Sequence, residues 1–407
     1  MADLTLSDVS LRARSRWHTW AAALIGLWLL TGVGIAIARA FGAPISWWVS
    51  VHSFTLGVVA TAILIYSTHF TQALTRTAAD DVRGLSIRVG LVQVGLILLI
   101  IGKAGCDWGA LADFAATLVI GAFIWHMVVV YRHLRSSLAG QFAVTVPFYL
   151  AAAAFLVVAG LLGNFAGRGV GTYSDMIAAH SRAAIWGFAW LTVLGTMVTL
   201  LPTLSGTRIS DLARRRCTRA LIVHCLGLSA VIVAQMLGHA VWAGVFQLVV
   251  VAAALLILQP VLSAVLTGGA VWTTASLSVT AGLLWMIAVC AADAASNITG
   301  ADPRMITLLL IPVFLGAGLL QLIFGVLHHL LPVLLAGGRA RVLRAKAAAD
   351  YGGVARVLLV NLGALLLLLI DAGPSRTAGF LLLGLGLVAH VGSLAVAVLL
   401  HHRSESS

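Results

Sequence analysis

WWVSVHSFTLGVVATAILIYSTHFTQALTR, residues 47–76, is the stretch of sequence that decides the fold. It is long and apolar enough to cross a bilayer as one helix, yet it carries a histidine near each end, His52 and His69. Because an ionisable side chain inside a membrane span is costly, each histidine is a candidate functional residue. The two are 17 positions apart, which is about 25 Å along a helix. They cannot ligate the same metal ion, and therefore predict two sites near opposite faces of the membrane.

The composition of the whole chain extends this interpretation. Hydrophobic residues make up 61% of the 407 residues and charged residues 9%, with a mean hydropathy of +1.06, whereas a soluble domain carries about a quarter charged residues. Apolar runs recur from end to end, which predicts an all-α, multi-pass protein of the cell membrane. We expect a single integral membrane domain over residues 1–407, with no soluble domain. The lipid bilayer is the expected partner.

The order of the apolar runs predicts twelve transmembrane helices. They cover residues 20–38, 47–72, 85–103, 111–131, 144–163, 176–201, 218–237, 241–262, 270–292, 305–328, 354–370 and 377–400. With this topology, 19 of the 25 Lys and Arg residues lie on the side that holds both termini. Because short cytoplasmic loops carry the excess of basic residues, both termini are predicted to be cytoplasmic. The stretch 332–353 predicts a basic cytoplasmic loop.

The net charge of +12 does not point to nucleic acid. The basic residues lie in short loops between spans, where an anionic inner leaflet attracts them, so we expect no nucleic-acid partner.

Two histidines lie at matched depth near the extracytoplasmic face. His52 and His180 each lie about one turn into a span that runs from outside to inside, and His239 is a third member of this outer layer. Imidazole is a common ligand of haem iron, copper and zinc, and two parallel helices with one histidine each suit axial haem ligation. The alternative is that each histidine only forms a hydrogen bond to a neighbouring helix.

A second layer of histidines lies toward the cytoplasmic face and predicts an inner metal site. Its candidate ligands are His69, His126, His224, His328 and His329. Adjacent residues point about 100° apart on a helix, so His328 and His329 cannot both face one site unless the helix ends there.

Charged residues near the outer layer have two interpretations. Arg182 lies two residues after His180, and Arg39 and Arg168 lie in outer loops. They could bind haem propionates or be ordinary interface charges. The acidic residues near the spans lie at outer ends, which argues against a proton-coupled transporter with a carboxylate at depth. The chain has no phosphate-binding loop, no H-E-x-x-H and no G-x-S-x-G, so it assigns no enzymatic reaction.

Three stretches resemble a known kind of membrane module. Residues 51–76, 179–209 and 321–338 are similar to segments of the module fused to copper-containing nitrite reductases and multicopper oxidases in actinobacteria. That module distantly resembles the haem–copper oxidase subunit and NnrS-type haem- and copper-containing proteins. In this chain Arg182 replaces the second histidine of the module's H-x-H element, and no H-P-E-V-Y follows His180. An oxygen-reducing haem–copper centre is therefore not expected.

The resemblance implies a redox-linked membrane protein with His52 and His180 as haem or copper ligands and His69 as a further candidate. We expect haem b, with copper as a second cofactor, in electron transfer or in nitrogen-oxide or copper metabolism. Because the copper reductase domain is absent, a separate extracytoplasmic cupredoxin or copper enzyme would be the partner. The alternatives are a cofactor-free transporter or permease and a structural membrane partner of a redox enzyme.

Overall fold

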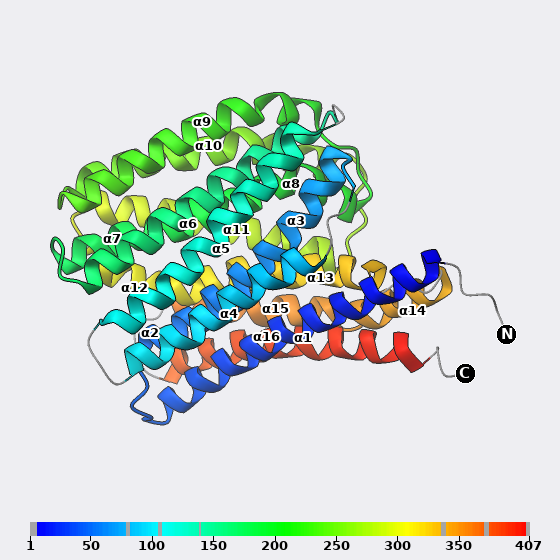
Figure 1. Cartoon of the computed structure of the whole chain (residues 1–407), viewed down its shortest axis with the longest axis horizontal. Helices are drawn as coiled ribbons and strands as arrows, with labels where there is room; N and C mark the ends of the chain where they lie inside the picture. Colours follow the sequence, from blue (N-terminus) through cyan, green and yellow to red (C-terminus); the bar gives the residue numbers. More distant parts are fainter. Residues whose placement is uncertain are drawn as a thin grey trace. The chain divides into compact units, whose positions relative to one another are not determined.

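The structure is a computed structural model that describes residues 6–78, 82–104, 108–137, 140–334, 339–369 and 374–403. Within these ranges the chain is all-helical and contains no strand (Figure 1). Twelve helical segments of this described part are long and apolar enough to cross a membrane. The predicted all-α architecture with twelve apolar spans is therefore confirmed.

Most spans are ordinary α-helices. Seven of the twelve found in the described ranges are one continuous helix each: α1 (Leu6–Ala40), α4 (Val82–Ala104), α5 (Ala110–Arg135), α9 (Asp211–Met236), α10 (Ala240–Thr267), α11 (Thr274–Ile298) and α16 (Pro374–Arg403). The fifth span is α6 (Val146–Gly167), which follows the short 3₁₀ turn η2 (Ala143–Thr145). The long pairs α9 with α10 and α15 (Gly353–Leu369) with α16 pack side by side (Figure 1).

One predicted loop is a helix instead. Of the predicted loop over residues 332–353, residues 332–334 belong to α13 (Gln321–Leu334) and residues 335–338 lie outside the described residues. Residues 339–350 form α14 (Arg339–Asp350), which leads directly into α15 through Gly352, where φ is +68°. Ala345 and Ala349 of α14 are buried against Ala397 of α16. The prediction of a loop was wrong because it weighed the basic residues and overlooked the alanines, which are strong helix formers and supply the buried face.

Three spans of the described chain change their winding in the middle. The second is α2 (Trp47–His52), η1 (Ser53–Ala60) and α3 (Thr61–Thr75); the sixth is α7 (Tyr173–Arg182), η3 (Ala183–Ala189) and α8 (Trp190–Ser205); the tenth is α12 (Pro303–Val313), η4 (Phe314–Leu320) and α13 (Gln321–Leu334). In each the η segment is a π-helix. π-Helical turns are rare in proteins, and those that do occur are often found at functional sites.

These π-helical segments recur at a constant spacing. They begin at Ser53, Ala183 and Phe314, which are 130 and 131 residues apart, and each has a glycine at its fifth position. The spacing equals four spans, so the twelve spans follow a pattern of three successive groups of four. At Gly187 a Cβ would lie 2.4 Å from the Cβ of Phe155, which means that η3 approaches α6 too closely for any side chain.

The chain divides into two compact units. The central unit comprises Ala38–Ala270 and Met286–Ile311, and the terminal unit comprises Met1–Ile37, Val271–Trp285 and Pro312–Ser407. The central unit therefore holds the second and sixth spans with His52, His69 and His180, whereas η4, α13 and the two last spans belong to the terminal unit.

Candidate functional site

His52 and His180 face each other in the central unit. Their ring centroids are 6.3 Å apart and their ring planes differ by 26°. His52 is the last residue of α2, directly before η1, and His180 lies three residues before η3. The structure thus brings together the two histidines that the sequence analysis paired by depth.

Backbone carbonyls orient both imidazoles in the same way. Nδ1 of His52 lies 2.9 Å from the carbonyl oxygen of Trp48, and Nδ1 of His180 lies 2.7 Å from that of Ala159 on α6. Because a carbonyl only accepts hydrogen bonds, each Nδ1 is the protonated nitrogen, and each Nε2 of the neutral ring carries a lone pair. A metal-ligating histidine is oriented by a hydrogen bond of this kind from its other ring nitrogen.

The distance between the rings fits one atom shared by both. A metal–imidazole bond is about 2.1 Å long, and a nitrogen lies about 1.1 Å from the centre of a ring whose bonds are near 1.33 Å. Two rings on opposite sides of one ion would therefore have centroids about 6.4 Å apart, close to the 6.3 Å observed. The separation of the ring centroids thus matches that of two imidazoles that hold one ion from opposite sides.

Trp48 and Gly163 pack against the rings of His52 and His180. Trp48 stacks on His52 with centroids 4.0 Å apart and planes 19° apart. A Cβ at Gly163 would lie 3.0 Å from Nδ1 of His180, so the absence of a side chain there lets α6 accept the ring. Both histidines are partly buried, whereas His239, the expected third member of the layer, is exposed at the start of α10.

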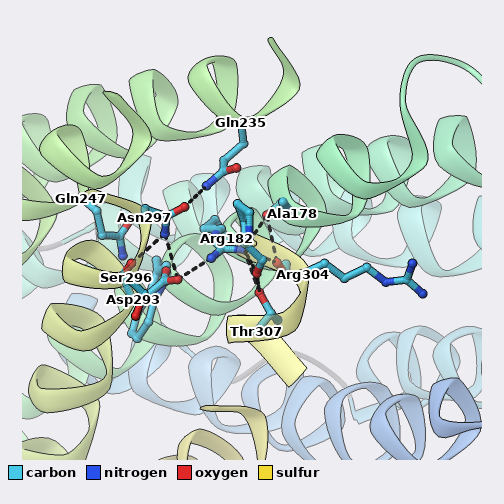
Figure 2. A network of polar contacts seen from close by, with 12 residues as sticks. Ala178, Arg182, Gln235, Gln247, Asp293, Ser296, Asn297, Arg304 and Thr307 are labelled. Carbon is cyan, nitrogen blue, oxygen red and sulfur yellow. Dashed lines mark hydrogen bonds and ion pairs between the residues drawn. The ribbon is translucent and has the colours of Figure 1, made fainter. Parts of the chain in front are cut away.

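Arg182 lies in a buried polar network, which Figure 2 shows. Its guanidinium forms an ion pair with Asp293 of α11, and Nη1 donates to the hydroxyl of Thr307 at 2.7 Å and to the carbonyl of Pro303 at 3.2 Å. The two charged side chains are 2% and 7% exposed. Among the described residues, Nε of Arg182 has no hydrogen-bond partner. Binding of a haem propionate by Arg182 stays a prediction, with Nε as the nitrogen that the protein does not use.

The network continues from Asp293 to Trp186 and Asn297, and through Asn297 to α9. The indole of Trp186, in η3, donates to Asp293 at 3.0 Å, and Asn297 donates to the same carboxylate at 3.2 Å. Gln235 of α9 donates to Asn297 at 2.8 Å (Figure 2). The carboxylate thus ties the segment that follows His180 to α11 and, through Asn297, to α9.

The two other candidate arginines have protein partners. Arg168 forms an ion pair with Asp113, which also accepts the indole N–H of Trp108 at 2.8 Å. The hydrogen bond from Arg168 to Asp113 raises the pKa of the guanidinium above its ordinary value. Arg39 donates to the carbonyl of Ile45 and lies over the ring of Trp47, 5.4 Å from its centroid. Binding of a haem propionate by either arginine stays a prediction, as does the alternative of an ordinary interface charge.

The inner histidines of the central unit lie in separate environments. His126 uses both ring nitrogens, Nε2 toward the hydroxyl of Ser67 at 2.9 Å and Nδ1 toward Arg88 at 3.0 Å. His224 donates from Nε2 to the carbonyl of Trp186 at 2.9 Å, and His69 is half-buried on α3. No cluster of three or more His, Cys, Asp or Glu able to hold a metal exists among the described residues. An inner site drawn from these histidines stays a prediction.

His328 and His329 belong to the terminal unit, and the structure gives His328 a neighbour that the sequence analysis did not single out. The ring of His390, on α16, lies 5.1 Å from the ring of His328 at an interplanar angle of 84°. His329 is only half-buried. The signal that could have found His390 is its place in the middle of an apolar span, where every ionisable residue is a candidate.

A scan of the sequence against protein-family models finds no match, and no curated protein is significantly similar to it.

Proposed function

We propose that this chain is a multi-pass protein of the cell membrane that binds b-type haem and takes part in electron transfer, with His52 and His180 as the two axial ligands. The observation that carries the proposal is the pair itself: two imidazoles 6.3 Å apart, each anchored through Nδ1 to a carbonyl. The sequence contains no C-x-x-C-H, so the haem would be held without covalent attachment.

The chain's own residues define what such a site does. His52 and His180 would hold the haem iron, and the chemistry that a haem held by two imidazoles would supply there is one-electron transfer. The carbonyls of Trp48 and Ala159 keep Nδ1 protonated and raise the basicity of each Nε2. Because Arg182 and Asp293 form an ion pair, their charges cancel near His52 and His180.

The proposed orientation puts both termini in the cytoplasm and the His52–His180 pair near the extracytoplasmic face. The basis is the distribution of Lys and Arg over the loops. A reporter that is active only in the cytoplasm, fused after Ser407, should be active. Activity of a reporter that works only on the extracytoplasmic side would show that the orientation is the reverse of the one proposed. An extracytoplasmic partner could then not dock at the face near His52 and His180.

Visible spectroscopy of the purified protein tests the haem proposal. We expect a reduced-minus-oxidised spectrum with Soret and α bands, and the loss of stoichiometric haem in His52→Ala and in His180→Ala. His239→Ala is the matched control, because His239 was predicted in the same layer but is exposed. Stoichiometric haem in both single variants would refute the ligand assignment. A colourless wild-type preparation from haem-replete cells would favour the cofactor-free transporter.

A further inference from the structure

The terminal unit contains a buried histidine whose ring lacks polar partners. His390 is 0% exposed, and among the described residues neither Nδ1 nor Nε2 has a hydrogen-bond partner. Phe324 stacks on the ring with centroids 5.9 Å apart and planes 10° apart. Burying a polar ring without a partner is unfavourable, so a bound group that the chain itself does not supply is the expected compensation.

His328 presents a lone pair beside this ring. Its Nδ1 donates to the carbonyl of Phe324 at 2.6 Å, so Nε2 carries the lone pair of the neutral ring. The hydroxyl of Ser393 lies 3.0 Å from this Nε2 and 2.9 Å from the carbonyl oxygen of His390, and its single proton can serve only one of these two acceptors at a time. A cation bound to Nε2 would leave that proton to the carbonyl of His390, so that both acceptors are satisfied.

The separation of the two rings fits a bent arrangement around one ion. With about 2.1 Å for each metal–nitrogen bond and about 1.1 Å from nitrogen to ring centre, centroids 5.1 Å apart correspond to a nitrogen–metal–nitrogen angle of roughly 105°. This is close to the tetrahedral value that d¹⁰ ions adopt. Ser393 is placed to contribute a third ligand atom.

The chemistry of the surroundings selects the ion. The two histidines offer soft-to-borderline nitrogen ligands, and no carboxylate joins them in a metal-binding cluster within the described part of the chain. A divalent zinc ion needs four ligands in a closed site. The charges of Arg356 and Asp350 act on His328, and that of Arg356 also acts on His390, so a double positive charge near this guanidinium would cost more than a single one. We propose that His328 and His390 form a binding site for a cuprous ion, distinct from the His52–His180 pair.

Cuprous-ion binding to the full-length purified protein tests this inference. We expect wild-type protein to take up one more Cu⁺ from a chromogenic chelator than His390→Gln does, with X-ray absorption of the bound copper showing nitrogen and oxygen ligands. Changes to residues that merely orient a ligand already cost 10- to 100-fold in metal affinity. His328→Gln and His390→Gln should therefore each lower Cu⁺ affinity by at least about 100-fold.

The matched control is His329→Gln, which changes the adjacent, half-buried histidine of the same helix and should leave Cu⁺ uptake unchanged. The His52→Ala and His180→Ala variants should also keep it, so a failure of the haem proposal does not affect this result. Equal Cu⁺ uptake by wild type and His390→Gln, both monodisperse and with the same thermal midpoint, would overturn the proposal. So would tighter binding of Zn²⁺ than of Cu⁺ at these two histidines.

Discussion

The two histidine pairs of this protein use the same side chain in contrasting ways. In the central unit the rings of His52 and His180 are 6.3 Å apart, nearly parallel and partly buried. In the terminal unit the rings of His328 and His390 are 5.1 Å apart, nearly perpendicular and almost fully buried. The first distance fits an atom in line between two nitrogens and the second fits a bent site. The two pairs consist of the same residue type, and it is the distance and the angle between their rings that distinguish the proposed haem site from the proposed Cu⁺ site.

The strongest test of this contrast is whether the pairs are independent. His180→Ala should lose haem and keep Cu⁺ binding, whereas His390→Gln should lose Cu⁺ and keep haem. The physical reason is that each pair draws its ligands from a different unit. Haem and copper content of both variants, measured on the same preparations, gives the answer. Loss of both cofactors in either variant, at unchanged thermal stability, would show that the two pairs form one functional centre.

Removing the partner of Arg182 should give the next largest effect. Asp293→Ala leaves the buried guanidinium without its counter-charge, and breaking a buried ion pair in this way costs about 3–5 kcal/mol of folding stability. The thermal midpoint should fall, and the haem bands should weaken because Asp293 also holds Trp186 of η3.

The control for this change removes both charges. The double variant Arg182→Met with Asp293→Leu should lose less stability than Asp293→Ala alone, since it leaves no unpaired buried charge. A double variant less stable than the single one would contradict the assignment of the cost to the unpaired arginine.

Filling the space beside His180 should weaken haem binding at His52 and His180 and leave Cu⁺ binding at His328 and His390 unchanged. Gly163→Ala places a methyl group 3.0 Å from Nδ1 and 3.2 Å from Cε1 of His180, and overpacking of this kind costs about 1–3 kcal/mol. Haem affinity should fall and the bands should shift, while Cu⁺ binding stays the same. Gly121→Ala is a matched control, because a Cβ there meets nothing within 4 Å. Equal spectra of the two variants would show that the ring of His180 does not need this space.

The smallest expected effect concerns Ser393. Ser393→Ala removes the hydroxyl next to Nε2 of His328 and one hydrogen bond to the carbonyl of His390, at a cost of about 0.5–1.5 kcal/mol in stability. If Ser393 supplies a third ligand atom, Cu⁺ affinity should fall about 10-fold or more, with both histidine–copper contacts retained in X-ray absorption. A variant with unchanged affinity would reduce the site to two ligands.

Hydropathy alone predicted the twelve spans, because each apolar run is long and its flanks are polar. The pairing of His52 with His180 followed from depth, since two spans of the same direction bring residues one turn from their starts to the same level. The ion pair of Arg182 with Asp293 could not be predicted in this way, because the two residues are 111 positions apart and nothing local marks them as partners.

The π-helical segments and His390 were missed for other reasons. A π-helix has no distinct hydropathy signal, and only the glycines at Gly57, Gly187 and Gly318, together with the recurring spacing, indicate it. His390 was not singled out, because its value as a ligand depends on its unpartnered ring nitrogens and on its closeness to His328, 62 positions away in the sequence.

The wide turn η1 also bears on the side of the span on which His69 lies. It lies between His52 and His69 on one span, and a π-turn holds more residues than a regular α-turn. Deleting one residue within 53–60 would therefore restore regular winding and leave His69 on its present side of the span. Deleting one residue from the regular helix between Thr61 and His69 would instead turn His69 by about 100° around the axis. The segment 53–60 is thus the part of this span whose length can change by one residue without redirecting His69.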